Sequence, residues 1–198
     1  MNGPNPLLTA ESLAVTRGGR LVFEAVSLTL RPGQFIALRG ANGAGKSSLL
    51  LTLAGALRPE AGTIGPAERE PLHLLAHSSA IKTRLTLAEN LDFWRRINGE
   101  TGLLPTAALD RVGLGGLGGI EAGHLSAGQT RRLALARLLA SDRRLWLLDE
   151  PLAALDESGG ALVEALIAER LAMGGGVIAA SHDDIAGTTS TLRLGGAT

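Results

Sequence analysis

Gly40-Ala-Asn-Gly-Ala-Gly-Lys46-Ser47 decides the fold, because it matches the pattern G-x-x-x-x-G-K-[S/T] without a gap. An apolar strand is expected before it, at Phe35–Leu38, and an apolar helix after it, ending near Gly55. Glycines let backbone N–H groups turn inward around a phosphate, and the helix adds the positive end of its dipole. A glycine-rich turn with a chance Lys-Ser is the plainer alternative, which the flanking strand and helix disfavour.

The stretch 40–47, here called the phosphate loop, therefore predicts a site for ATP and Mg²⁺. We expect the Lys46 ammonium to reach the β- and γ-phosphates and the Ser47 hydroxyl to bind the Mg²⁺ ion. The residues expected to contact the nucleotide here are Gly40, Ala41, Asn42, Gly43, Ala44, Gly45, Lys46, Ser47 and Ser48.

Strands and helices are expected to alternate along the chain. Strand patterns cover 7–39, 72–76, 145–148 and 177–180. Helical patterns cover most of 82–140, with Leu91, Trp94 and Ile97 on one side of a helix, and also 160–172; the glycine-dense stretch 113–123 is expected to be irregular. This alternation predicts an α/β fold with a mainly parallel, doubly wound sheet.

The composition is that of one well-packed domain, predicted to span 1–198. Lys and Arg number 19 and Asp and Glu number 19, a balance that argues against a partner held by nucleic-acid phosphates. There is no cysteine, which excludes disulfides and thiolate metal sites. The N-terminal residues lack the charge and apolar run of a secretory signal, and apolar stretches such as Leu49–Leu57 are about half the length needed to span a bilayer.

A second chemical feature is the stretch Leu145-Trp-Leu-Leu-Asp149-Glu150, a buried strand that ends in two acids. We expect Asp149 to hold the Mg²⁺ water shell and Glu150 to orient or polarise the attacking water. Many strands end in acids at a surface, so the pair by itself says little. It becomes informative because it accompanies the phosphate loop. Glu150 and Lys46 are accordingly expected to be catalytic.

The stretch Leu125-Ser-Ala-Gly-Gln129 precedes a helix, with Ser126 as a natural N-cap and Gly128 permitting close approach of a ligand. A capped helix is the plain reading of the same residues. Together with the two features above, in this order, the stretch resembles the signature motif of the ABC transporter ATP-binding family. That resemblance implies head-to-tail pairing of two subunits, in which Ser126, Gly128 and Gln129 of one close over the ATP held by Lys46 of the other.

Further motifs of that family follow in the expected order. Ala154-Leu155-Asp156 resembles the D-loop, which places Asp156 at the nucleotide, and Ser181-His182 resembles the switch histidine that touches the γ-phosphate. The resemblance implies a P-loop ABC ATPase domain with a RecA-like, mainly parallel core, an antiparallel β subdomain and a helical subdomain at about 82–140.

Two positions depart from the family pattern. The Q-loop glutamine is absent, and Ser78 stands in the corresponding stretch. The aromatic residue that usually stacks on adenine is also absent; Arg17 is expected to replace it through its guanidinium plane, with Phe23 as a weaker candidate. These departures predict a modest preference for ATP over GTP.

The stretch Ala80-Ile-Lys-Thr-Arg-Leu-Thr-Leu-Ala-Glu-Asn-Leu91, the signature helix and the short length resemble the CcmA family, the ATPases of the haem exporter of bacterial cytochrome c maturation. The resemblance implies an ATP hydrolase that powers haem export or the release of haem-loaded CcmE chaperone. It implies a homodimer, an integral membrane partner of the CcmB type with CcmC and CcmD nearby, and a peripheral location on the cytoplasmic face of the inner membrane. Lys82 and Arg84 are either a solvated basic pair or neighbours of the groove for a coupling helix of that partner.

Other functions are compatible with parts of the pattern. An ABC ATPase that serves a small-solute transporter is the main alternative. A soluble ABC protein acting on ribosomes or DNA is disfavoured by the single cassette, the missing heptad insertion and the balanced charge. A non-catalytic cassette is disfavoured because Lys46, Asp149, Glu150 and His182 are all present.

Overall fold

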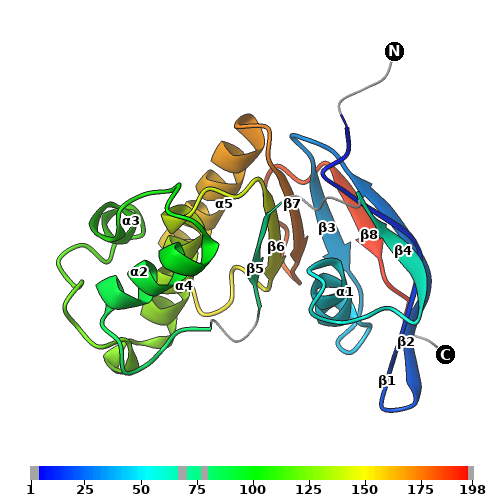
Figure 1. Ribbon diagram of the computed structural model, residues 1–198, viewed down its shortest axis with the longest axis horizontal. Helices are drawn as coiled ribbons and strands as arrows, with labels where there is room; N and C mark the ends of the chain where they lie inside the picture. Colours follow the sequence, from blue (N-terminus) through cyan, green and yellow to red (C-terminus); the bar gives the residue numbers. More distant parts are fainter. Residues whose placement is uncertain (1–4, 67–70, 77–79, 196–198) are drawn as a thin grey trace. The chain divides into compact units, whose positions relative to one another are not determined.

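The computed structural model describes residues 5–66, 71–76 and 80–195 (Figure 1). In chain order the elements are β1 (Leu8–Arg17), β2 (Arg20–Leu30), β3 (Phe35–Arg39), α1 (Lys46–Leu53), β4 (Ala61–Gly65), β5 (Leu72–Leu75), α2 (Leu87–Asn98), α3 (Pro105–Arg111), the 3₁₀ turn η1 (Ala122–His124), α4 (Ala127–Ala140), β6 (Leu145–Asp149), α5 (Glu157–Ala172), β7 (Gly176–Ala180) and β8 (Ser190–Arg193). The predicted α/β class is confirmed. No helix in these described ranges is both long and apolar enough to cross a bilayer.

The chain forms two compact units. The first comprises Met1–Ala76, Arg144–Pro151 and Glu164–Thr198, and the second comprises His77–Arg143 and Leu152–Val163. Helix α5 begins in the second unit and ends in the first. The expectation of a single ATP-binding domain with a helical part at about 82–140 stays a prediction.

The first unit contains two sheets. One is antiparallel, in the order β2-β1-β4, and the other has the order β5-β6-β7-β3-β8 with every neighbouring pair parallel. Strands β6 and β7 are buried at every position, as expected for the centre of a parallel sheet. The sequence pattern predicts neither β4 nor β8, because both are edge strands whose mostly exposed side chains carry no apolar alternation.

Helix α1 belongs to the hydrophobic core that the two sheets share. Its residues Leu49, Leu50 and Leu53 are at most 1% exposed and join one cluster with side chains from both sheets. Members of that cluster include Leu13, Leu30, Leu38, Leu147 and Ile178. The helix that follows the phosphate loop is therefore fixed by burial on several sides, which also fixes where the loop ends.

The second unit is helical and contains α2, α3, η1, α4 and the start of α5. The face of α2 differs from the one expected: Leu87, Asn90, Leu91 and Arg95 are its buried residues, and Ile97 is 57% exposed. The reason is helical geometry, since each step of three residues turns the side chain by about 60° from the starting direction, so positions 91 and 97 lie about 120° apart. The prediction that Ile97 lies on the same side of the helix as Leu91 was wrong.

A buried arginine braces α4 against α2 in this unit. The Arg137 guanidinium lies 4.6 Å from the centre of the Trp94 ring. Burial, with a further contribution from neighbouring Arg131, lowers the pKa of Arg137 to about 10. The group still carries its charge at neutral pH and stacks on the ring as a cation.

Candidate functional site

The phosphate loop leads from β3 into α1 through glycines with positive φ. Gly40, Gly43 and Gly45 have φ values of +154°, +83° and +95°. Gly45 is the N-cap of α1 and supplies no side-chain cap. Because the first N–H groups of a helix have no partner inside the helix, the start of α1 offers donors to an anion. The loop therefore fits a phosphate group.

Close packing explains why two of these positions are glycine. A Cβ added at Gly40 would lie 2.6 Å from the carbonyl oxygen of Leu194, and one at Gly45 would lie 2.7 Å from Cγ1 of Val22 and 3.0 Å from Cδ1 of Phe23. At Gly43 no atom lies within 4 Å. The loop thus rests directly on β2 and on the chain after β8, which holds its backbone in one conformation.

Lys46 directs its ammonium into the loop. Its Nζ donates to the carbonyl oxygens of Gly40, at 2.8 Å, and Ala41, at 3.2 Å, and the residue is 8% exposed. Ser47 is exposed, whereas Ser48 is buried and its carbonyl accepts a bond from Thr52. A cation and a hydroxyl therefore stand at adjacent positions of the loop, as triphosphate and Mg²⁺ binding require.

Asp149 is the last residue of strand β6, and Glu150, which follows it, has an unusual backbone conformation. Asp149 is 6% exposed, and Glu150 has a φ of +47°, which is rare for a residue with a side chain. The Glu150 N–H donates to the carbonyl oxygen of Ala180 at 2.8 Å, which holds this turn against the end of β7. Strain of this kind clusters at functional sites, and here it directs the Glu150 carboxylate to within 3.6 Å (Oε1) of Nε2 of His182.

Sheet order brings these groups together. Strands β6, β7 and β3 are adjacent and parallel, so their carboxyl ends meet at one edge of the sheet. Asp149 ends β6 and Glu150 follows it, His182 follows β7 and the phosphate loop follows β3. Ligands of open α/β sheets bind at this edge. The donor set of one serine hydroxyl and one carboxylate, completed by phosphate oxygens, is also what Mg²⁺ prefers.

The signature residues lie in the second unit, at the start of α4. Ser126 is the N-cap: its Oγ accepts from the Gln129 N–H at 3.2 Å, and its own N–H donates to Oε1 of Gln129 at 3.0 Å. The prediction of a Ser126 cap is confirmed. A Cβ at Gly128 would lie 3.0 Å from the carbonyl oxygen of Ala154, so the helix start packs closely against the 152–158 segment.

Asp156 caps the start of α5. Its Oδ1 accepts from the Gly159 N–H at 2.8 Å, from the Ser158 hydroxyl at 2.9 Å and from Nη2 of Arg132 at 3.1 Å. These bonds, the Gly159 N–H first, hold the pKa of Asp156 below its ordinary value. Arg132 thereby joins the signature helix to this segment within the second unit.

Asn90 organises the 82–86 stretch. It is fully buried, accepts from the Lys82 N–H at 2.8 Å and donates to the carbonyl oxygens of Lys82, Leu85 and Thr86. The Lys82 ammonium lies 4.4 Å from the centre of the Phe93 ring. Arg84 is exposed. The stretch is thus a fixed loop with its basic side chains outermost.

The structure bears differently on the two residues expected to stack on adenine and on Ser78. Arg17 is exposed at the end of β1, so its role stays a prediction. Phe23 is 3% exposed and lies under Gly45, so it has no free ring face and this candidate is wrong. Ser78 lies outside the described residues.

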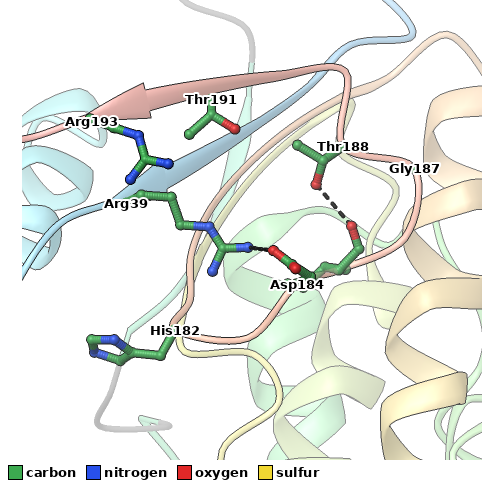
Figure 2. A pocket seen from close by; sticks show the side chains of 8 residues that line it. Arg39, His182, Asp184, Gly187, Thr188, Thr191 and Arg193 are labelled. Carbon is green, nitrogen blue, oxygen red and sulfur yellow. Dashed lines mark hydrogen bonds and ion pairs between the residues drawn. The ribbon is translucent and has the colours of Figure 1, made fainter.

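Sequence reasoning missed Arg39 and Asp184. Together with His182 they line a cavity of about 490 Å³ in the first unit, and Figure 2 shows the Arg39 guanidinium turned toward the Asp184 carboxylate. Arg39 is the one charged residue in an otherwise apolar strand and directly precedes Gly40. That position is the signal in the sequence that could have identified it.

Comparison with known proteins gives consistent results. The family model described as ABC transporter matches residues 23–153. The cytochrome c biogenesis ATP-binding export protein CcmA of Rhizobium johnstonii is 48% identical, over 90% of this chain and 89% of that protein. The protein of the same name from Mesorhizobium japonicum is 43% identical, over 95% and 98% respectively. Among solved structures, the ATP-binding cassette MJ0796, dimeric and bound to ADP and Pi, superposes with a TM-score of 0.84 over 94% of both chains at 19% identity.

Proposed function

Because the chain belongs to the ABC transporter family, and within it to the CcmA group, we propose that it is the ATP-hydrolysing subunit of a complex that powers haem export, or release of a haem-loaded chaperone, in cytochrome c biogenesis. The observation that carries the ATPase assignment is the convergence of the phosphate loop, Asp149, Glu150 and His182 at the ends of three adjacent parallel strands. The assignment to cytochrome c biogenesis rests on the CcmA relatives.

The chemistry proposed for these residues is hydrolysis of the γ-phosphate. The Glu150 carboxylate accepts a proton from the attacking water while the water oxygen bonds to the γ-phosphorus and the bond from that phosphorus to the leaving ADP oxygen breaks. Lys46 and His182 stabilise the charge on the phosphate oxygens. Ser47 and Asp149 would hold Mg²⁺, which would supply positive charge to the phosphate oxygens. The nearness of His182 to Glu150, at 3.6 Å, supports a shared task.

The signature residues are proposed to complete the site of a second copy. Ser126, Gly128 and Gln129 stand at the N-terminus of a capped 14-residue helix, where backbone donors and the dipole favour an anion. In a head-to-tail homodimer this helix start faces the γ-phosphate held by Lys46 of the partner, with Asp156 beside it.

The complex is proposed to include an integral membrane subunit of the CcmB type, together with CcmC and CcmD, and no nucleic acid. The chain then lies peripherally on the cytoplasmic face of the inner membrane. This proposal is supported by the export role in the name of its relatives. Arg17 is proposed to stack on adenine. Because the usual aromatic residue is missing, nucleotide competition should show only a modest preference for ATP over GTP, and strong discrimination in favour of ATP would count against this expectation.

Glu150→Gln tests the hydrolysis step. The variant keeps the shape of the side chain and loses the base, so we expect phosphate release to fall at least about a hundredfold while ATP binding persists. Glu24→Gln, the same change at an exposed position of β2, is the matched control and should behave as the unaltered chain. Undiminished phosphate release by Glu150→Gln would refute the assignment of the base.

The biological role is tested separately from the chemistry. In a bacterium that lacks its own copy, the unaltered chain should restore covalent haem attachment to c-type cytochromes, and Lys46→Ala should not. Restoration by both would show that ATP hydrolysis is not needed. Restoration by neither, with ATPase activity intact in the unaltered chain, would assign the chain to another transporter.

A further inference from the structure

Arg39 joins the start of the phosphate loop to the segment that carries His182. Its Nη1 donates to the carbonyl oxygen of Ser181 at 2.7 Å. Its Nη2 donates to Oδ1 of Asp184 at 2.6 Å (Figure 2). The two acceptors lie on either side of His182 in the sequence. The backbone of Arg39 is bonded directly to Gly40.

The contact with Ser181 fixes the direction in which the chain leaves β7. That carbonyl belongs to the peptide group leading into His182, and a peptide group is planar. Holding its oxygen therefore also orients the His182 N–H and Cα. Ser181 is 4% exposed and the Arg39 side chain is 16% exposed, so water competes weakly for this bond.

The rest of the segment is anchored beyond His182. Ile185 is 5% exposed, and the Ala186 N–H donates to Oε1 of Glu164 at 3.0 Å. The His182 side chain itself is 54% exposed, and its Nε2 lies 3.6 Å from Oε1 of Glu150. With its own ring largely in solvent, His182 depends on its backbone for its position.

We propose that Arg39 is a positioning residue for ATP hydrolysis, acting through His182. The inference rests on the proposed ATPase function. A planar guanidinium reaches two diverging acceptors at once, which a lysine ammonium on a flexible stem does not do with the same geometry. Arg39 thus holds the segment around His182 in a fixed position relative to the phosphate loop, which begins at the next residue, Gly40.

Arg193 provides a matched control. It is paired in register with Arg39 on the neighbouring strand β8 and lines the same cavity. It is exposed and, within the described residues, its side chain forms no hydrogen bond or ion pair. Arg193→Gln removes the same charge from the same cavity and leaves both contacts of Arg39 in place.

The test compares kcat, KM and nucleotide Kd in the full chain co-purified with its membrane subunits. We expect Arg39→Gln to lower kcat about tenfold or more, because displacement of a catalytic group by about 1 Å is enough for such losses. KM and Kd for ATP should stay within about twofold, as should all three constants in Arg193→Gln. A raised Kd with unchanged kcat, or an equal loss in Arg193→Gln, would overturn the proposal.

A double-mutant cycle separates positioning from general structural damage. In a His182→Ala background, Arg39→Gln should lower kcat by less than about twofold further, since the residue through which it acts is gone. If Arg39→Gln lowers kcat by the same factor in the His182→Ala background as in the unaltered chain, the proposal is overturned. Arg39→Lys should have a kcat between those of the unaltered chain and Arg39→Gln, because a lysine can re-form one of the two bonds. A kcat no higher than that of Arg39→Gln would count against the proposed role of the two guanidinium bonds.

Asp184→Asn keeps the test decisive even where Arg39→Gln folds poorly. The Asp184 side chain is fully exposed, so its replacement leaves packing intact. We expect about a threefold loss of kcat that disappears in the His182→Ala background, and a loss that persists there refutes the mechanism. Absence of any Lys46-dependent hydrolysis in the unaltered complex would instead refute the proposed function.

Discussion

Gly45→Ala is expected to destabilise the first unit through two separate effects. The residue has a φ of +95°, and holding an L-residue in a left-handed conformation costs about 1–2 kcal/mol. The new methyl would also lie 2.7 Å from Cγ1 of Val22 and 3.0 Å from the Phe23 ring, and overpacking of this kind costs about 1–3 kcal/mol. Reduced freedom of the unfolded chain offsets about 0.5–1 kcal/mol. The net loss is therefore about 3 kcal/mol.

Gly43→Ala isolates the first effect. Its φ is +83°, but no atom lies within 4 Å of the added Cβ, so we expect a loss of about 1 kcal/mol. Val22→Ala combined with Gly45→Ala tests the second effect, because it removes the nearest clashing atom. The double variant should recover about 1 kcal/mol relative to the sum of the two single variants.

Thermal unfolding in the absence of nucleotide measures these differences. For a chain of this size, about 3 kcal/mol corresponds to a fall of roughly 6–12 °C in Tm, against roughly 2–4 °C for Gly43→Ala. Equal losses at the two glycines, together with additive losses for Val22→Ala and Gly45→Ala, would show that the close packing of the loop on β2 is not what requires glycine at position 45.

Three further changes test other parts of the structure. Ser126→Ala removes the bond from the Gln129 N–H and should lower the free energy of unfolding by about 1 kcal/mol in urea titration; an unchanged midpoint contradicts the capping box. Asn90→Ala leaves the Lys82 N–H and several carbonyls without their buried partner. The free energy of unfolding in the same assay should therefore fall by at least about 2 kcal/mol. A smaller fall indicates that water replaces the amide. The lowered pKa of Asp156 means that the unfolded chain binds a proton more readily, so this carboxylate stabilises the fold above its unfolded pKa and the contribution is lost as the pH falls through the folded pKa. Asp156→Asn should accordingly flatten the decline of Tm below about pH 4, whereas a decline as steep as that of the unaltered chain contradicts the assignment.

Local patterns were read correctly from the sequence because their physical causes are local. The phosphate loop is a contiguous backbone turn, so its glycines and Lys46 identify it by spacing. The Ser126 cap likewise depends on a residue three positions away, and the buried strand β6 on an unbroken apolar run. The face of α2 was misjudged at Ile97 because a three-residue spacing drifts around the helix over two steps.

By itself, the sequence determined that this protein carries a phosphate loop, two acids after a buried strand, and a capped signature helix. Only the tertiary structure decided which of these features meet. The order β6-β7-β3 places β3 beside β7, which is far from it in the chain, and places β6 on the other side of β7, which sets Glu150 beside His182. The ion pair of Arg39 with Asp184 joins residues 145 positions apart. No local pattern encodes such a contact, because it arises from the register in which buried parallel strands align.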